Sequence, residues 1–410
     1  MRVLMLHNRY REYGGEDAVA DAEITLLRSR GVEVLSLDAY NHTDSRLRLK
    51  GSLALAMHSH WSKESYDGVR RICREFQPDV AHTHNFWMRL TPAVHAACHD
   101  EGVPTIQTLH NFRLFCVNAQ FQRSGHTCHD CLARVPWRGV VHRCYRDSFM
   151  ASAAVARMIM TSRLHNIWSE RVNAFIVLSE YARRLFITGG IPAERIRIKP
   201  NFVEDRSSVR MPPSRSAQFL FVGRLSPEKG VATLLCAWAE CRVGLEARLI
   251  ILGDGPERNR LLNQAVRLGI SDRVTFMGYQ QPVEVMSLLG GARAVIIPSL
   301  YQECFPRILA EALSAGRPVI ASQICGLDEL VTPDIGLLAP PSNAAALAEL
   351  IETLYQDPSL ADRLGAAARA RYLLAYTPQR NFDTLMQIYE FAMTGVEPKP
   401  VARMSAGGVG

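Results

Sequence analysis

The sequence predicts an α/β protein built from two doubly wound domains, each a parallel sheet covered by helices. Three observations support this class. Short apolar runs alternate with stretches of helical length along most of the chain, this first alternation ends at a polar segment near residue 204, and a second one then starts. With 410 residues, 48% of them hydrophobic, the chain also holds more apolar material than one core takes up.

The first alternation predicts an N-terminal domain of residues 1–203. An insert at 111–148 interrupts this pattern, and a polar segment at 204–216 is expected to be the linker to the next domain. The predicted strands of this domain are 3–6, 32–37, 80–81, 105–108 and 174–178, with helical stretches such as 18–30 and 66–76 between them.

The second alternation predicts a C-terminal domain of residues 204–377. A helix over 378–393 is long enough to pack back on the first domain, and residues 394–410 are expected to be disordered. Ligands of doubly wound sheets bind beyond the carboxyl ends of the strands, so two such domains predict a cleft with one substrate on each wall. The predicted strands here are 218–222, 248–252, 273–276, 294–297 and 318–321.

Composition indicates a cytoplasmic protein. The N-terminus has no signal-peptide pattern, and no apolar run approaches the roughly 18 residues of a membrane helix. Ten cysteines in such a chain indicate thiols or metal ligands rather than disulfides.

The positive charge is concentrated in the first half of the chain. Residues 1–200 hold 27 Lys plus Arg and 19 Asp plus Glu, a balance of +8 in a chain whose net charge is +7. Nine Arg and three acidic residues lie in the segment 111–171 among several aromatic side chains. We expect this segment to meet an anionic membrane surface or a phosphorylated lipid rather than nucleic acid, although a solvated basic face has the same composition.

Two glutamates flank the start of a predicted helix in the second domain. Glu303 lies in the preceding loop, Pro306 suits the first turn, and Glu311 lies on the flank of the apolar stripe of the helix. Free backbone amides near Phe305 and Arg307 are expected in the same loop. Two carboxylates and free amides can hold the hydroxyls of a sugar, although two solvated glutamates would show the same pattern.

Arg224 and Lys229 lie in a predicted strand-to-helix loop, within FLFVGRLSPEKGV. On charge alone these two residues could equally be solvated surface groups. They could also stabilise the diphosphate of a sugar nucleotide, which gains negative charge as the glycosidic bond breaks. At an effective dielectric near 20, each unit charge about 4 Å from a phosphate contributes on the order of 4 kcal/mol before desolvation. These cations could serve in place of a metal ion, and the sequence has no Asp-x-Asp pair that would favour Mg²⁺.

Glycines and a histidine mark the ends of other predicted strands. Gly253 follows a strand in ILGDGPE, where a tight turn would also need it, and Gly14 and Gly15 precede a helix whose N-terminus can face a phosphate. His110 ends a strand and is therefore expected to point into the cleft, although a single histidine is more often structural.

Four cysteines of the insert have the spacing C-x11-C-x2-C-x12-C. Four thiolates suit a tetrahedral Zn²⁺ site with no open position, which would fix the insert beside His110 and carry out no hydrolysis. The alternatives are free buried thiols, or a site in which a nearby histidine replaces one thiolate. The four residues are Cys116, Cys128, Cys131 and Cys144, and the nearby histidines are His126, His129 and His142.

The second half resembles glycosyltransferase family 4, the retaining enzymes of the GT-B fold. The resemblance lies in the Glu303-x7-Glu311 spacing and in the string around Arg224 and Lys229. It implies that Glu303 and the adjoining amides hold hydroxyls of the donor sugar, that Glu311 binds the ribose, and that the two cations bind the diphosphate. Cys304 departs from the family pattern, which most often has glycine there.

The same resemblance implies roles for residues outside the glutamate pair. Gly15 would close over the diphosphate, His110 would lie near the reacting carbon, and the loop at 277–279 would approach the base. The string HNFRLFC…CHDC…CY is also similar to a subgroup that builds bacterial exopolysaccharides. The expected catalytic residues are His110, Arg224, Lys229 and Glu303, and the expected donor-binding residues are Gly14, Gly15, Gly253, Tyr279, Phe305, Pro306, Arg307 and Glu311.

The expected function is transfer of a hexose, with retention, from a UDP- or GDP-sugar to a saccharide acceptor that is lipid-linked. The chemistry would need no cofactor, and the protein would associate peripherally with the cytoplasmic membrane face. A sugar-nucleotide epimerase of the same fold and a non-catalytic nucleotide-binding subunit are the alternatives. The basic aromatic insert speaks against the epimerase, and the intact set of charged residues speaks against the subunit.

Overall fold

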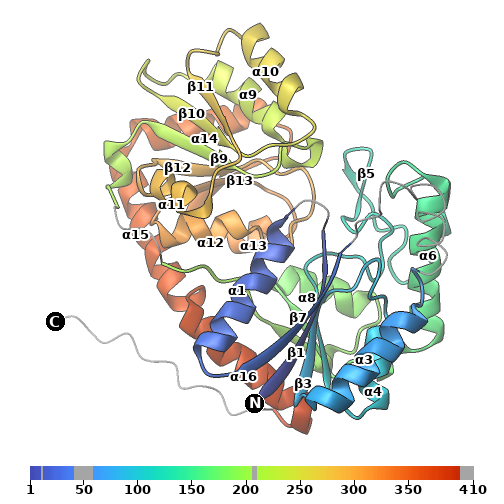
Figure 1. Ribbon diagram of the computed structural model, residues 1–410. Helices are drawn as coiled ribbons and strands as arrows, with labels where there is room; N and C mark the ends of the chain where they lie inside the picture. The colour runs from blue at the N-terminus through green and yellow to red at the C-terminus, as the bar shows by residue number, and fades with distance from the viewer. Residues whose placement is uncertain (11–12, 41–58, 206–209, 398–410) are drawn as a thin grey trace.

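The computed structural model describes residues 1–10, 13–40, 59–205 and 210–397. The described chain contains two parallel sheets of six strands each, which lie in separate halves of the molecule (Figure 1). This arrangement confirms the predicted α/β class with two doubly wound domains. Part of the expected linker, 206–209, and most of the expected disordered tail, 398–410, lie outside the described residues.

The first sheet has the strand order β2-β1-β3-β4-β7-β8, with every neighbouring pair parallel. The order reverses between β1 and β3, which is where such sheets open a ligand crevice. Its strands are Arg2–Arg9 (β1), Glu33–Tyr40 (β2), Val80–Asn85 (β3), Thr105–Thr108 (β4), Ala174–Val177 (β7) and Ile196–Ile198 (β8). Its main helices are Gly15–Ser29 (α1), Lys63–Phe76 (α3), Ala93–Asp100 (α4), Phe149–Leu164 (α6), Ile167–Glu170 (α7) and Glu180–Thr188 (α8).

Strand β3 is longer than predicted. The sequence suggests a strand only at 80–81, because the polar run His82 to Asn85 follows, yet these polar residues continue the strand and are buried. They can stay buried because other polar groups pair with them, as buried polar groups require. The polar half of β3 is therefore part of a polar core rather than a loop.

The second sheet has the strand order β11-β10-β9-β12-β13-β14 and is again wholly parallel. Its sixth strand, Gly336–Ala339 (β14), was not predicted, because its short apolar run lies between Gly336 and Pro340, residues that are typical of loops. The other strands are Gln218–Val222 (β9), Arg248–Leu252 (β10), Val274–Gly278 (β11), Ala294–Ile297 (β12) and Val319–Ser322 (β13). The helices are Val231–Glu240 (α9), Arg258–Arg267 (α10), Pro282–Gly290 (α11), Arg307–Ser314 (α12), Leu327–Leu330 (α13), Ala344–Gln356 (α14) and Pro358–Ala375 (α15).

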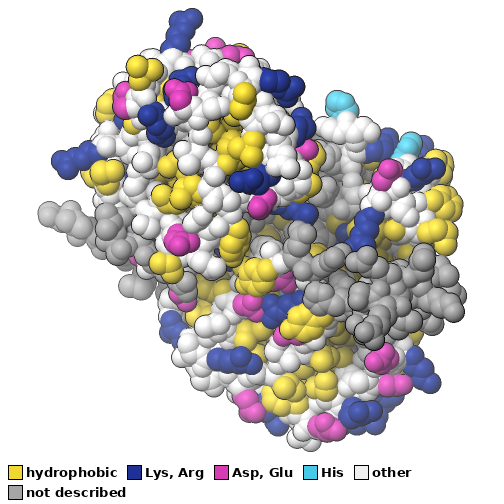
Figure 2. Space-filling model, turned by 45° about the horizontal axis from the view of Figure 1, so that its top comes forward, with side chains coloured by type: hydrophobic (Ala, Val, Ile, Leu, Met, Phe, Trp, Pro, Cys, Tyr) yellow, Lys and Arg dark blue, Asp and Glu magenta, His cyan; other side chains and the backbone are white. Residues whose placement is uncertain are grey.

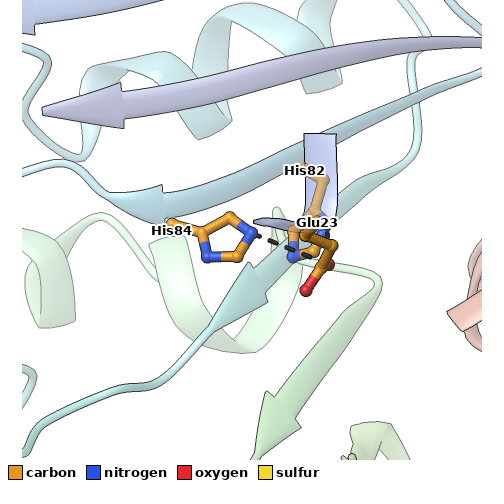
Figure 3. A group of neighbouring side chains, drawn as sticks. All are labelled: Glu23, His82 and His84. Atoms are coloured by element: carbon orange, nitrogen blue, oxygen red, sulfur yellow. Dashed lines mark ion pairs between the residues drawn. The ribbon is translucent and has the colours of Figure 1, made fainter. Parts of the chain in front are cut away.

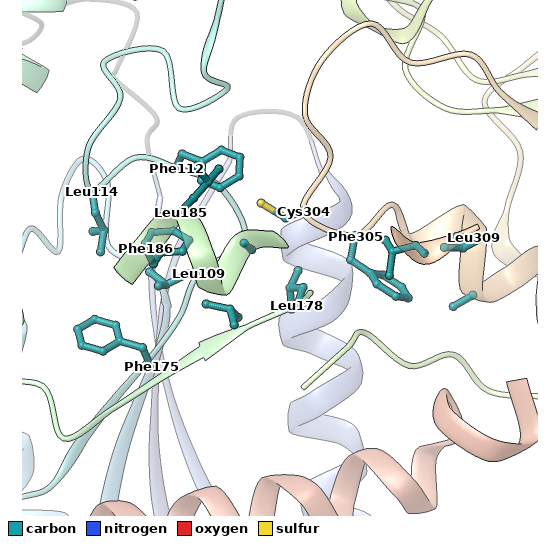
Figure 4. Close-up of a cluster of buried hydrophobic side chains, with 14 of the residues drawn as sticks. Leu109, Phe112, Leu114, Phe175, Leu178, Leu185, Phe186, Cys304, Phe305 and Leu309 are labelled. Atoms are coloured by element: carbon teal, nitrogen blue, oxygen red, sulfur yellow. The ribbon is translucent and has the colours of Figure 1, made fainter. Parts of the chain in front are cut away.

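The last helix, Pro378–Thr394 (α16), leaves the second domain and runs beneath the first sheet (Figure 1). Leu385, Ile388 and Tyr389 of this helix belong to one buried core with Val3 and Met5 of β1. A single apolar cluster also joins the domains below the cleft, where Phe112 and Leu178 of the first domain and Phe305 and Leu309 of the second belong to one group (Figure 4). The two domains are thus joined in two places, by α16 in the core of the first domain and by the apolar cluster that they share.

Within the described ranges, every helix is too short or too polar to cross a membrane.

Candidate active site

A cavity of about 240 Å³ lies where the two domains meet. The first domain lines it with the N-terminus of α1 and the chain that follows β4, and the second domain lines it with the loop between β12 and α12. His110 and Glu303, which are far apart in sequence, therefore share one cavity. The charged and polar lining residues include Tyr10, Glu16, His110, Asn111, Arg113, Asn118, Gln120, Tyr301, Gln302 and Glu303.

Glu303 is buried and its carboxylate is fully engaged. Lys229 Nζ lies 2.7 Å from Glu303 Oε1, Ser299 Oγ donates to the same oxygen at 2.8 Å, and Tyr301 OH donates to Oε2 at 2.8 Å. Burial lowers the pKa of the Lys229 ammonium, but Glu303 and Tyr301 outweigh burial and raise it above its ordinary value. Lys229 is therefore a cation held against the carboxylate.

Lys229 comes from the short 3-10 turn Pro227–Lys229, which ends at Gly230 with a φ of +69°. A Cβ on Gly230 would lie 1.9 Å from the carbonyl oxygen of Pro298, so only glycine lets the turn approach the end of β12 this closely. Arg224 lies in the same β9 to α9 loop but is exposed, and neither Arg224 nor Lys229 is among the residues that line the cavity. The two predicted diphosphate cations thus differ in their environments.

Glu311 lies on α12, one turn beyond Arg307, whose Nε is 2.9 Å from Glu311 Oε1. Burial raises the pKa of the Glu311 carboxyl, and Arg307 opposes that rise. Pro306 is the extended residue that precedes α12, and Phe305 is buried with its ring 5.3 Å from that of Tyr376. Phe305 also borders the cavity, and it comes directly before Pro306, the N-cap of α12. The N-terminus of α12 therefore lies close to the cavity.

His110 follows β4 and pairs with a second histidine. His84 Nδ1 lies 2.9 Å from His110 Nε2, and the two rings stack with an interplanar angle of 24°. Burial and the neighbouring His84 lower the pKa of His110 well below its ordinary value. His110 is therefore an uncharged imidazole at neutral pH.

A polar core lies behind His110. Glu23 Oε1 is 3.5 Å from His82 Nδ1 and 3.7 Å from His84 Nε2, and Figure 3 shows all three side chains converging. Lys199 Nζ lies 2.9 Å from the other oxygen of Glu23. The Lys199 ammonium and the histidines lower the pKa of Glu23 well below its ordinary value against the opposing effect of burial. Sequence reasoning missed this core, for which the alternating His82-Thr83-His84 in a strand was the available signal.

Glu16 and its partners were also missed. Tyr10 OH donates to Glu16 Oε2 at 2.7 Å and Asn111 Nδ2 donates to Oε1 at 2.7 Å, and all three residues line the cavity. Burial raises the pKa of Glu16. Its place directly after Gly14 and Gly15 at a helix N-terminus could have indicated it.

The glycines predicted to bind the donor lie in two different environments. Gly14 is the N-cap of α1 and donates its amide to Asp17 at 2.9 Å, and a Cβ on Gly15 would meet nothing within 4 Å. Gly253 has a φ of +126°, and a Cβ there would lie 2.0 Å from the carbonyl oxygen of Gly223. Gly253 is thus required by backbone packing, whereas Gly15 leaves open space. Tyr279 follows β11 and is 63% exposed.

The four cysteines of the insert line one small cavity of about 10 Å³ as free thiols. The insert has little regular structure apart from Gln122–Arg123 (β5), His126–Thr127 (β6) and Trp137–Val141 (α5). It reaches the second domain beside Glu303, because Gln122 Nε2 donates to the carbonyl of Leu300 at 3.0 Å.

Each of the two domains matches a family model built from known proteins. Residues 2–201 match the family model "Glycosyl transferase 4-like domain", and residues 204–371 match "Glycosyl transferases group 1". Glycogen synthase of Mycobacterium tuberculosis is 28% identical over 334 residues, which cover 80% of this chain and 72% of the relative. D-rhamnosyltransferase WbpZ of Pseudomonas aeruginosa is 34% identical over 162 residues, 39% of this chain and 41% of the relative.

The fold is shared with solved structures of low sequence identity. Anabaena Alr3699/HepE, solved in complex with UDP, superposes with a TM-score of 0.67 at 19% identity, and the alignment covers 95% of this chain and all of that chain. Since the two family models together span residues 2–371 with a gap of two residues, the chain belongs to glycosyltransferase family 4 and is a glycosyltransferase with the GT-B fold.

Proposed function

We propose that this glycosyltransferase moves a hexose, with retention, from a UDP- or GDP-sugar to a lipid-linked saccharide during exopolysaccharide or other cell-surface glycan synthesis. The observation that carries the proposal is the meeting of His110 and Glu303 in one interdomain cavity, where the Glu303 carboxylate holds Lys229 from behind. The relatives are named for glycogen synthesis and rhamnosyl transfer, and a structural neighbour holds UDP. These names support a nucleotide-sugar donor.

In this proposal, Lys229 and Arg224 stabilise the leaving diphosphate. Lys229 is held by Glu303 before the donor binds, and a sugar hydroxyl that donates to Glu303 would release the ammonium toward a phosphate oxygen. Because the carboxylate then keeps a hydrogen-bond donor, neither charge is left without a partner. The diphosphate, on the same face of the sugar as the incoming hydroxyl, takes up the proton that the hydroxyl loses.

The remaining donor contacts rest on the family resemblance, because most of the residues concerned lie outside the lining of the cavity. Glu311 would accept hydrogen bonds from ribose hydroxyls, and the backbone from Phe305 to Arg307 would donate to the sugar at the N-terminus of α12. Gly14 and Gly15 would admit the diphosphate to the N-terminus of α1 from the first domain. Gly253 and Tyr279 would border the nucleotide.

A lipid-linked acceptor would reach the cleft along the surface of the insert and α6. Trp137, Val141, Phe149 and Met150 are each more than half exposed there, beside several exposed arginines. Figure 2 shows hydrophobic and basic side chains side by side at the edge of the molecule that carries α6. Apolar side chains among arginines suit the interface of an anionic membrane, which supports peripheral association with the cytoplasmic membrane face.

The four insert cysteines suit a structural zinc ion, which we propose as a clip for the insert rather than as a participant in transfer. All four border one cavity, although among the described residues no three of their sulfur atoms lie within 4.8 Å of one another, so zinc binding would draw the thiolates together. The insert has few helix or strand hydrogen bonds of its own to hold its shape. Measuring the zinc content of purified protein, and of a Cys128→Ser/Cys131→Ser variant, tests this. One zinc per chain that the variant loses is expected, and zinc-free wild-type protein would refute the clip.

The function itself is tested with a panel of UDP- and GDP-sugars, each incubated with and without a lipid-linked saccharide acceptor. We expect release of nucleotide diphosphate that depends on one donor and rises with the acceptor. A changed sugar with its nucleotide still attached would identify an epimerase. Binding of nucleotide without any turnover would identify a non-catalytic subunit.

A further inference from the structure

His84 and His110 form a hydrogen-bonded pair whose proton can sit on either ring. We propose that His84 is a positioning residue that keeps the proton of His110 on Nε2 and so leaves His110 Nδ1 as a hydrogen-bond acceptor in the cleft. This inference rests on the proposed function to the extent that His110 meets the reacting sugar. The class of ligand group that it selects is a sugar hydroxyl.

The hydrogen bond between the two rings requires that one ring nitrogen donates and the other accepts. His84 Nδ1 and His110 Nε2 are 2.9 Å apart, so one nitrogen donates its hydrogen and the other accepts it. His84 is buried and His110 is half-buried beside the cavity, and desolvation lowers the pKa of each imidazole. Each imidazole is therefore neutral and carries one proton, and the pair has two arrangements to choose between.

Glu23 selects one of these arrangements. His84 Nε2 faces Glu23 Oε1 at 3.7 Å, both atoms are buried, and neither has a hydrogen-bond partner among the described residues. A proton on His84 Nε2 points at the carboxylate, whereas a bare nitrogen would set two acceptors against each other. His84 Nδ1 is then bare and must accept, so His110 Nε2 carries the proton.

The surrounding charges favour this choice and disfavour a metal ion. The ligand atoms of Glu23, His82 and His84 lie within 4.8 Å of one another, a spacing that could suit a cation (Figure 3). However, the Lys199 ammonium already lies 2.9 Å from Glu23, and His82 uses both ring nitrogens, one with Tyr389 OH at 2.9 Å and the other with Thr108 Oγ1 at 2.7 Å. The group is therefore a fixed polar core that orients His84.

The consequence reaches the cavity through His110 Nδ1. This nitrogen has no hydrogen-bond partner among the described residues and is not one of the buried polar atoms, while His110 itself lines the interdomain cavity. With its proton on Nε2, His110 offers a lone pair to whatever enters. It can accept from a sugar hydroxyl and cannot donate to a phosphate, so a donor that lacks the matching hydroxyl should be rejected.

Nuclear magnetic resonance on full-length protein labelled with ¹⁵N-imidazole histidine tests the tautomer directly. The ¹⁵N shift distinguishes a protonated ring nitrogen from a bare one, and the His110 signals are those missing from a His110→Gln sample. We expect His110 to show a protonated Nε2 and a bare Nδ1. The opposite tautomer, or a charged ring, at neutral pH would overturn the proposal even if transfer activity is found.

Two substitutions at position 84 separate positioning from packing. Asn places its Oδ1 where histidine has Nδ1, so His84→Asn keeps an acceptor for His110, whereas His84→Leu does not. We expect the Leu variant to show a mixed His110 tautomer and a kcat/KM lower by about ten- to a hundredfold, and the Asn variant to keep the tautomer and most of the activity. Equal tautomers in both variants would overturn the role of His84.

The readouts also separate this proposal from the proposed function. A wild-type protein with the expected tautomer but no glycosyl transfer would refute the function and leave the positioning role intact. If the Leu variant does not fold, the wild-type tautomer and the Asn variant still decide the question.

Discussion

The two walls of the cleft hold their polar groups in different ways. On the first-domain wall, His110 stands in front of a buried set of histidines and carboxylates whose partners come from α1, β3, β4 and α16. On the second-domain wall, Lys229 and Glu303 pair in loops at the ends of β9 and β12. The polar groups of the first wall are therefore held by one another, whereas under the proposed function the second wall would exchange its internal ion pair for contacts with the donor.

The two domains also differ in which buried groups can change charge. All 13 histidines lie before residue 166, so the second domain has none. Buried charges of the second domain include Arg293 and Arg317, whose guanidinium groups donate to backbone carbonyls. Burial lowers the pKa of Arg317 only to about 10, so it stays charged at neutral pH. The histidine-rich domain is the one that acid should affect first.

The largest expected effect falls on the second wall. Under the proposed function, Lys229→Ala should reduce kcat/KM by about a thousandfold, or about 4 kcal/mol, because the leaving diphosphate loses a half-buried cation. Steady-state release of nucleotide measures this. Arg267→Ala, an exposed cation of the same domain, is the matched control and should stay near wild type. A Lys229→Ala enzyme within threefold of wild type would remove the reason for treating this wall as the diphosphate site.

The second-largest expected effect is a loss of stability of the first domain at low pH. Burial lowers the pKa of His95 to about 4, so the folded state excludes a proton that the unfolded chain binds below pH 6.5. The stabilisation is complete above pH 6.5 and is lost as the pH falls toward 4, by about 3 kcal/mol from this residue. Hydrogen exchange at pH 7 and pH 4.5 should show faster opening of residues 1–203 than of the second domain.

His95→Gln checks the origin of this acid sensitivity. The substituted side chain does not titrate, so the difference in unfolding free energy between pH 7 and pH 4.5 should shrink by most of the histidine contribution. Equal acid sensitivity of the two domains in the wild-type protein would break the comparison between them.

Substitution of Glu311 should have a smaller effect, which weakens donor binding and leaves turnover nearly unchanged. If its carboxylate accepts from ribose hydroxyls, Glu311→Gln should raise the donor KM about tenfold and leave kcat nearly unchanged, because the contact is equally strong in the ground and transition states. Glu349→Gln, which changes an exposed carboxylate of α14 in the same domain, is the matched control and should stay near wild type. A fall in kcat with an unchanged KM would contradict the assignment to ribose.

The smallest effect on stability is expected at Gly15. A Cβ there meets nothing, so Gly15→Ala should change the free energy of unfolding by less than about 0.5 kcal/mol while it raises the donor KM. Gly253→Ala is the counterpart on the other wall and should destabilise the second domain by several kcal/mol, because its Cβ would meet a carbonyl oxygen at 2.0 Å. Thermal unfolding of both variants measures the contrast.

The sequence predicted the elements whose physics is local and missed the groups that meet only in space. Apolar runs revealed nearly all strands, and Pro306 preceding α12 fixed the place of Glu303. The polar half of β3 was missed because burial of His82 and His84 depends on Glu23 and Tyr389, which lie far away in the chain. The pairing of Lys229 with Glu303 was likewise hidden, since no spacing rule joins residues 74 apart.

The path of α16 has a consequence for protein synthesis. Residues 1–203 leave the ribosome first, yet α16 supplies Leu385 and Ile388 to the core of that domain and the Tyr389 hydroxyl to His82. Until the whole second domain has been translated, the part of the first sheet that α16 covers in the folded protein is therefore left exposed beside α1. A fragment that ends at residue 203 should aggregate, whereas the same fragment with α16 joined to it has the residues it needs to close its core.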